Sequence, residues 1–222
     1  MRKILSSDEG EAPEGSDLVT SLRAAAPYLH TFRGRTFVVV FPGEAVAEGA
    51  FPALARDLAF LAGLGIRLVL VHGARPQIAG QMARRGVEPR FVGERRVTDG
   101  DALEAVKEAV GRLRLEVEAE AGLRLASGSF LRARPVGVRG GVDFQFTGEV
   151  RSVDGERIRR CLDAGEIVLL SPLGYSPTGE LFNVAAEEVA AAAAAALPAD
   201  KLLFLMEGDG PKEAPDALPG QL

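Results

Sequence analysis

The residues that build disulfides and soft metal sites are scarce in this chain. Among 222 residues there is one cysteine, Cys161, and there are two histidines, His30 and His72. A single thiol excludes an intrachain disulfide and a cysteine-based zinc site, and two histidines disfavour a histidine-rich metal site. We therefore predict no metal centre, and we interpret Cys161 as a small core residue.

Long apolar runs are also missing. No stretch reaches the roughly 18 apolar residues that a membrane span requires, and residues 1–15 lack the apolar centre of a signal peptide. The net charge is −5 and the pI is about 5.3, which disfavours nucleic acid and anionic membranes as partners. We expect a cytoplasmic protein that engages no nucleic acid and no membrane.

Common catalytic signatures are absent too, because the chain has no Walker A sequence, no G-x-G-x-x-G that opens a helix and no G-x-S-x-G elbow. What is present is a core, since 47% of the residues are hydrophobic. Short apolar runs predict buried strands at residues 36–41, 66–71, 166–170 and 201–206. Helical periodicity predicts helices at residues 52–64, 76–85, 99–122, 154–164 and 184–196. This alternation predicts an α/β fold with a mainly parallel sheet.

Four segments organise the chain. We expect a disordered leader (1–16), an arm helix (17–33) whose apolar stripe lies outside the α/β rhythm, a domain (34–206) and an irregular tail (207–222). Within the domain we expect a tight turn at 42–44, a hairpin of strands 130–138 and 144–150, and a loop at 171–183. Thr98 and Asn183 are expected to cap the helices that follow them.

The predicted ligand site lies where three strands end. Segments 42–44, 72–75 and 171–183 each follow a predicted parallel strand, and open α/β sheets bind ligands at that edge. Arg95, Arg96 and Thr98 follow soon after, and they suit a small carboxylate or phosphate. Ordinary βα turns with surface arginines would explain the same spacing. For His72 a general base and a hydrogen-bonded structural residue are both open.

Five stretches resemble the amino-acid kinase family, in its N-acetylglutamate synthase branch. They are RGRTFVVVFPGEAV, LGIRLVLVHGARPQI, RRVTD, GVDFQFTGEVR and TGELFNVAAEEVA, within residues 18–206. The resemblance implies a three-layer αβα sandwich and an N-terminal helical arm that joins subunits into a homo-oligomer. It also implies a vestigial kinase pocket, lined by Gly43, Glu44, His72, Gly73, Arg75, Arg96, Thr98 and Asn183. Tyr28 and Lys201 are candidate contacts for L-arginine.

Two family motifs that serve phosphoryl transfer are altered in this chain, and these differences decide whether kinase activity is expected. The family's kinases hold the transferring phosphoryl group with the lysine of K-x-G-G, and the matching residues here run from Val40 to Gly43. The family's Asn-x-x-x-Asp pair corresponds to Asn183 and Glu187. Because phosphoryl transfer depends on positioned charge, no kinase activity is expected.

The resemblance therefore implies an arginine-sensing regulatory domain of an enzyme that transfers acetyl from acetyl-CoA to L-glutamate, the first step of arginine biosynthesis. We expect no catalytic residue and no bound cofactor in this chain, because an acetyltransferase domain, in cis or in trans, would supply the chemistry. The alternatives are an N-acetylglutamate kinase that uses ATP and magnesium, and a structural oligomerisation module. Residues 122–127 look short by a loop and a strand, so we expect a fragment or a degenerate copy.

Overall fold

The computed structural model describes residue 20 and residues 31–206. The chain divides into two compact units, residues 1–33 and 34–222, and the description below concerns the second. The predicted leader, the tail, Tyr28 and most of the predicted arm helix lie outside the described residues.

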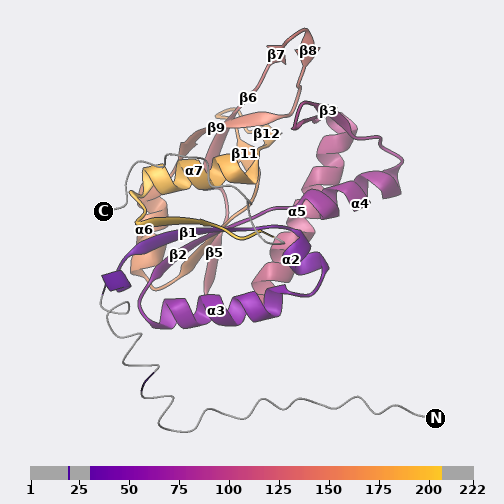
Figure 1. The fold of residues 1–222 in the computed structure, drawn as a ribbon. Helices are drawn as coiled ribbons and strands as arrows, with labels where there is room; N and C mark the ends of the chain where they lie inside the picture. Colours follow the sequence, from indigo (N-terminus) through magenta and orange to yellow (C-terminus); the bar gives the residue numbers. More distant parts are fainter. Residues whose placement is uncertain (1–19, 21–30, 207–222) are drawn as a thin grey trace, which may run out of the picture. The chain divides into compact units, whose positions relative to one another are not determined.

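The domain is built on a five-stranded parallel sheet (Figure 1). Its order is β13 (Lys201–Phe204), β1 (Thr36–Phe41), β2 (Arg67–His72), β10 (Ile167–Leu170) and β5 (Leu125–Ser127). Every neighbouring pair runs parallel. The three central strands are continuous apolar runs that are almost wholly buried, as strands covered on both faces must be.

Helices cover both faces of this sheet (Figure 1). On one face α6 (Gly155–Asp163) and α7 (Ala186–Ala196) pack against the strands, and Val38, Val40 and Val71 join their core. The other face carries α3 (Phe51–Gly63) and α5 (Gly100–Ala121), with α4 (Arg75–Arg85) against α5. The predicted three-layer αβα sandwich is therefore confirmed.

A second sheet stands beside α7, in the order β12 (Leu181–Asn183), β11 (Leu173–Tyr175), β6 (Leu131–Pro135) and β9 (Gly148–Val153). The antiparallel pairing of β6 with β9 confirms the predicted hairpin. Its tip is the small hairpin of β7 (Val138–Arg139) and β8 (Val142–Asp143). Another short hairpin, β3 (Arg90–Val92) and β4 (Arg95–Val97), was not predicted.

The hairpin prediction was wrong for residues 144–147, which are not part of a continuous strand. The Phe144 N–H donates to the carbonyl of Gly137, and the Phe146 N–H donates to the carbonyl of Thr98. Gln145 between them has a positive φ of 48°. These cross-links replace the regular ladder, so the strand begins only at Gly148.

Four other boundaries differ from the predictions. The 42–44 turn leads into a one-turn helix, α2 (Glu44–Ala47), and the 171–183 loop contains the β11–β12 pair. Asp99, not Thr98, caps α5, because its side chain accepts from the N–H of Ala102. The segment predicted to have lost a strand contains β5, a parallel neighbour of β10. In the described part of the chain, no helix is long and apolar enough to span a bilayer.

Candidate functional site

The candidate site begins at the edge where β1, β2 and β10 end together. Phe41 is in register with His72, and Val71 with Leu170. Because all three strands run parallel, the turns that start at Pro42, Gly73 and Ser171 share this edge. The predicted convergence of three loops is therefore confirmed.

Two glycines allow the first two turns to touch. The Gly73 N–H donates to the Phe41 carbonyl at 2.8 Å, and a Cβ on Gly73 would lie 3.1 Å from the Gly43 nitrogen. A Cβ on Gly43 would lie 3.1 Å from the Cα of Ala74. Gln77 fixes the contact, because its Nε2 donates to the Gly43 carbonyl at 2.7 Å. No motif or spacing in the sequence points to this role of Gln77.

His72 lies beneath these turns and is fully buried. Its Nδ1 is 3.1 Å from the Gly73 carbonyl, so we assign the proton to Nδ1. Nε2 then accepts from the Ser171 hydroxyl at 2.9 Å. Burial lowers the pKa of His72 to about 4, because the interior disfavours the imidazolium. This geometry fits the structural interpretation of His72, which ties the end of β2 to the end of β10.

Arg96 is the half-buried cation of the site. Its guanidinium lies 4.8 Å from the centre of the Phe91 ring, and Nη1 lies 2.9 Å from the sulfur of Met82. Burial, and then the positive charge of Arg75, lower the pKa of Arg96. No acidic side chain pairs with Arg96 among the residues that the structure describes. A partly desolvated guanidinium without a carboxylate is poised to take an anionic ligand.

A cavity of about 580 Å³ lies between α4, the β3–β4 hairpin and α7, and Arg75 is the kinase-pocket residue in its lining. Arg75 and Glu187 face each other across it at 3.4 Å. Its lining is Arg75, Val92, Glu94, Arg95, Phe144, Ala185 and Glu187. Both members of the ion pair are largely exposed, so the pair contributes little stability and an incoming anion can compete with Glu187 for Arg75.

Thr98 and Asn183 are brought together from positions 85 residues apart. Asn183 Nδ2 donates to Thr98 Oγ1 at 3.1 Å, and Thr98 is fully buried. The cap predicted for Asn183 is therefore wrong: α7 starts at Ala186, with Ala185 as an N-cap that makes no side-chain hydrogen bond. The amide is used to hold the start of α5 against the end of β12.

Arg95, unlike Arg96, pairs with acidic side chains. Its Nη1 lies 3.3 Å from Glu149, and its Nη2 lies 3.7 Å from Glu188. Glu149 also pairs with Arg134 and Arg139. Burial raises the pKa of Glu149, but the three arginines outweigh it, so the net pKa is lowered. Arg95 therefore belongs to a structural ion-pair network, which the sequence did not reveal.

Two predicted residues are not part of this constellation. Lys201 starts β13 opposite Phe37, at the amino-terminal edge of the sheet and away from the turns, and Tyr28 lies outside the described residues. Glu44 is the first residue of α2 and is half-buried. In the described ranges no cluster of histidine, cysteine or acidic side chains is suited to a metal ion.

Residues 35–211 match the amino acid kinase family. The chain belongs to the amino acid kinase family. A similar curated relative is the amino-acid acetyltransferase of Ectopseudomonas mendocina, 52% identical over 206 residues, which cover 87% of this chain and 48% of the relative. The chain thus spans about half the length of the curated relatives it matches.

Among family structures, N-acetylglutamate synthase from Neisseria gonorrhoeae is similar in two complexes. The complex with coenzyme A and L-arginine aligns with a TM-score of 0.82 and 38% identity, over 89% of this chain and 49% of the other. The complex with coenzyme A and N-acetyl-glutamate aligns with a TM-score of 0.81 and 39% identity, over 89% and 47%. At the strand end where the family's kinases carry a lysine, this chain has Val40, which packs into the core beneath α7.

Proposed function

We propose that this chain is the kinase-like, arginine-sensing regulatory domain of an N-acetylglutamate synthase. In this proposal a separate acetyltransferase domain, in cis or in trans, transfers acetyl from acetyl-CoA to L-glutamate, and L-arginine bound through the domain described here inhibits it. The chain itself then carries out no acyl transfer. The similarity to amino-acid acetyltransferases and to a synthase complexed with coenzyme A and L-arginine supports this proposal.

One observation favours regulation over phosphoryl transfer. Val40 is 7% exposed and belongs to the apolar core, so the first strand presents no ammonium to a phosphoryl group. Arg75 is the nearest substitute, but it pairs with Glu187, and a planar guanidinium does not replace the point charge of lysine. Stabilising the charge of the transferring group is the main task in this reaction, and the strand end lacks the residue for it.

The remaining pocket is still suited to an acidic ligand. Arg96 supplies an uncompensated cation, the turns of Gly43 and Gly73 supply closely approaching backbone, and Asn183 is held in place by Thr98. We propose that these residues, with Glu44, His72 and Arg75 around them, form the inherited kinase pocket. We also propose that Tyr28 and Lys201 contact L-arginine. The arm helix is the proposed contact between subunits of the oligomer.

Thermal unfolding of the chain with L-arginine, with Mg-ATP plus N-acetylglutamate, and with acetyl-CoA, each added separately, tests this function. A ligand at about 100 times its dissociation constant stabilises the folded state by roughly 2.7 kcal/mol, which raises Tm by about 5–10 °C for a domain of this size. We expect a rise with L-arginine and none with D-arginine as the matched control. ADP release above background with N-acetylglutamate would instead establish the kinase alternative.

The proposed oligomer contact needs a separate measurement. Light scattering should give fewer chains per particle for a chain that lacks residues 1–30 than for the intact chain. An unchanged number of chains per particle would remove the role assigned to the arm while leaving arginine binding open to its own test.

A further inference from the structure

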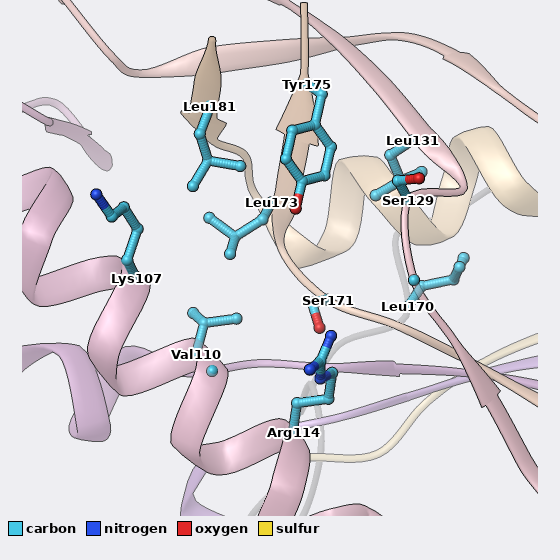
Figure 2. A pocket seen from close by; sticks show the side chains of 12 residues that line it. Lys107, Val110, Arg114, Ser129, Leu131, Leu170, Ser171, Leu173, Tyr175 and Leu181 are labelled. Carbon is cyan, nitrogen blue, oxygen red and sulfur yellow. The ribbon is translucent and has the colours of Figure 1, made fainter. Parts of the chain in front are cut away.

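A second cavity, of about 250 Å³, lies between α5 and the strands β6, β11 and β12 (Figure 2). None of the residues assigned to the kinase pocket lines it. Its lining is Lys107, Val110, Gly111, Arg114, Gly128, Ser129, Leu131, Leu170, Ser171, Leu173, Tyr175 and Leu181. The lining comes from a helix, four strands and two loops, so the cavity is built by tertiary structure.

The cavity has a polar end and an apolar wall. Figure 2 shows the guanidinium of Arg114 pointing toward the hydroxyl of Ser171, with the Tyr175 ring above them. Leu173 and Leu181 face the space from the β11–β12 hairpin, and Val110 faces it from α5. A cation and hydroxyls beside leucines suit a ligand that has a charged group at one end and hydrocarbon at the other.

The guanidinium of Arg114, at the polar end, has an unsatisfied hydrogen-bond donor. Arg114 Nε is buried and makes no hydrogen bond in the described structure; its ion pair with Glu118 is long, at 3.5 Å. Glu118 meanwhile accepts from the Ser127 hydroxyl at 2.6 Å. The positive charge of Arg114 also contributes, after burial, to the lowered pKa of His72. Arg114 therefore places a cation at this end of the cavity, with Glu118 as its only ion-pair partner among the described residues.

Gly111 keeps the cavity open. It lies in the middle of α5, where glycine is among the least favourable residues. A Cβ at this position would meet nothing within 4 Å, so close packing against a neighbour does not explain the glycine. Its lack of a side chain adds space to the cavity instead.

We propose that this cavity binds a small monocarboxylate that carries an apolar chain. The carboxylate lies at Arg114, with the Tyr175 hydroxyl as a further donor, and the hydrocarbon lies against the leucines. The Ser171 proton is already donated to His72, so Ser171 lines the site without serving as a donor. At 250 Å³ the cavity is smaller than the roughly 300–1,000 Å³ of drug-sized sites, which limits the occupant to a short chain.

Hexanoate is the probe, and calorimetric titration of the full chain is the first readout. Tyrosine fluorescence is the second, because the chain has two tyrosines and no tryptophan, so a Tyr28→Phe chain reports Tyr175 alone. We expect saturable hexanoate binding with a change in Tyr175 emission. Hexylamine, which has the same chain and the opposite charge, should not bind.

Two matched pairs of variants locate the site. Arg114→Gln should weaken hexanoate binding roughly tenfold or more, whereas Arg112→Gln should leave it unchanged. Arg112 is on the same helix with its own i,i+4 glutamate but is exposed and outside the cavity. Gly111→Leu places its Cβ in open space, and the rest of the side chain should fill the cavity and abolish binding. Gly111→Ala should bind with at most a small loss.

Absence of saturable binding overturns the proposal, and so does equal binding by Arg114→Gln and Arg112→Gln. A change in the number of chains per particle on Gly111→Leu, measured by light scattering, would show that a second copy covers this face. That result also overturns the proposal. None of these readouts depends on L-arginine or on acetyl transfer, so failure here leaves the proposed function standing.

Discussion

Acidification should destabilise this protein through His72, in a pH range above that of most carboxylates. The pKa of His72 is about 4 in the folded chain and about 6.5 in an unfolded chain. As the pH falls below 6.5, the unfolded chain takes up a proton that the folded chain refuses. The neutral His72 therefore costs no stability above about pH 6.5, and the free energy of unfolding falls as the pH is lowered from there towards 4.

The size of the effect follows from the two pKa values. The full difference of about 2.5 units corresponds to roughly 3.4 kcal/mol, of which about 2 kcal/mol is lost between pH 7.5 and pH 5. Full burial of the ring means that solvent screening does not reduce this figure. For a chain of this length the loss lowers Tm by about 4–8 °C.

Urea unfolding of the wild-type chain and of His72→Gln at pH 7.5 and pH 5 measures the stability that is lost through His72. Glutamine reaches the position of Nε2 and keeps a partner for Ser171, so the variant should fold with lower stability and a flatter pH dependence. The carboxylates and His30 are common to both chains, so the difference between them isolates His72. The reasoning fails if both chains lose the same stability between the two pH values, or if the His72 ring titrates near pH 6.5 by NMR.

Three further substitutions test particular contacts. Gly174→Ala places a Cβ 2.6 Å from that of Ala133, and urea unfolding should show a loss of about 1–3 kcal/mol from overpacking. Asn183→Ala leaves the buried Thr98 hydroxyl without its donor and should cost about 1–2 kcal/mol; a Thr98→Val double-mutant cycle that shows no coupling would contradict this. Glu149 has a lowered pKa, so the stability that its carboxylate contributes is present above about pH 4.5 and is lost on further acidification. Glu149→Gln should therefore unfold at a lower temperature than the wild-type chain at pH 7, and its stability should depend less on pH in the acid range.

The sequence was most informative where burial dominates. The central strands are apolar runs covered on both faces, and the helices between them have one apolar stripe, so composition and period alone predict the layers. The convergence of the turns at Pro42, Gly73 and Ser171 followed from parallel topology. The short strands β3 and β5 were missed because their residues are exposed or half-buried, and such strands carry no hydrophobic pattern.

Polar side chains were harder to assign, because their partners are distant in the chain. Asn183 has the identity and position of a helix cap, yet its amide bonds to Thr98 across 85 residues. Arg95 and Arg96 are adjacent and chemically identical, but Arg95 belongs to the network of Glu149, and Arg96 has no acidic partner among the described residues. Which neighbour is committed depends on the register of β4, which no local rule fixes.

The valine at residue 40 also bears on which side chains the first strand can accept during evolution. Its side chain belongs to the apolar cluster beneath α7, together with Val38, Val71 and Val189. A single codon change to lysine would begin a charged side chain inside that cluster, where an unpaired ammonium is strongly disfavoured. We expect such a variant to be less stable than the wild-type chain. The packing of α7 against β1 thus selects for an apolar side chain at residue 40.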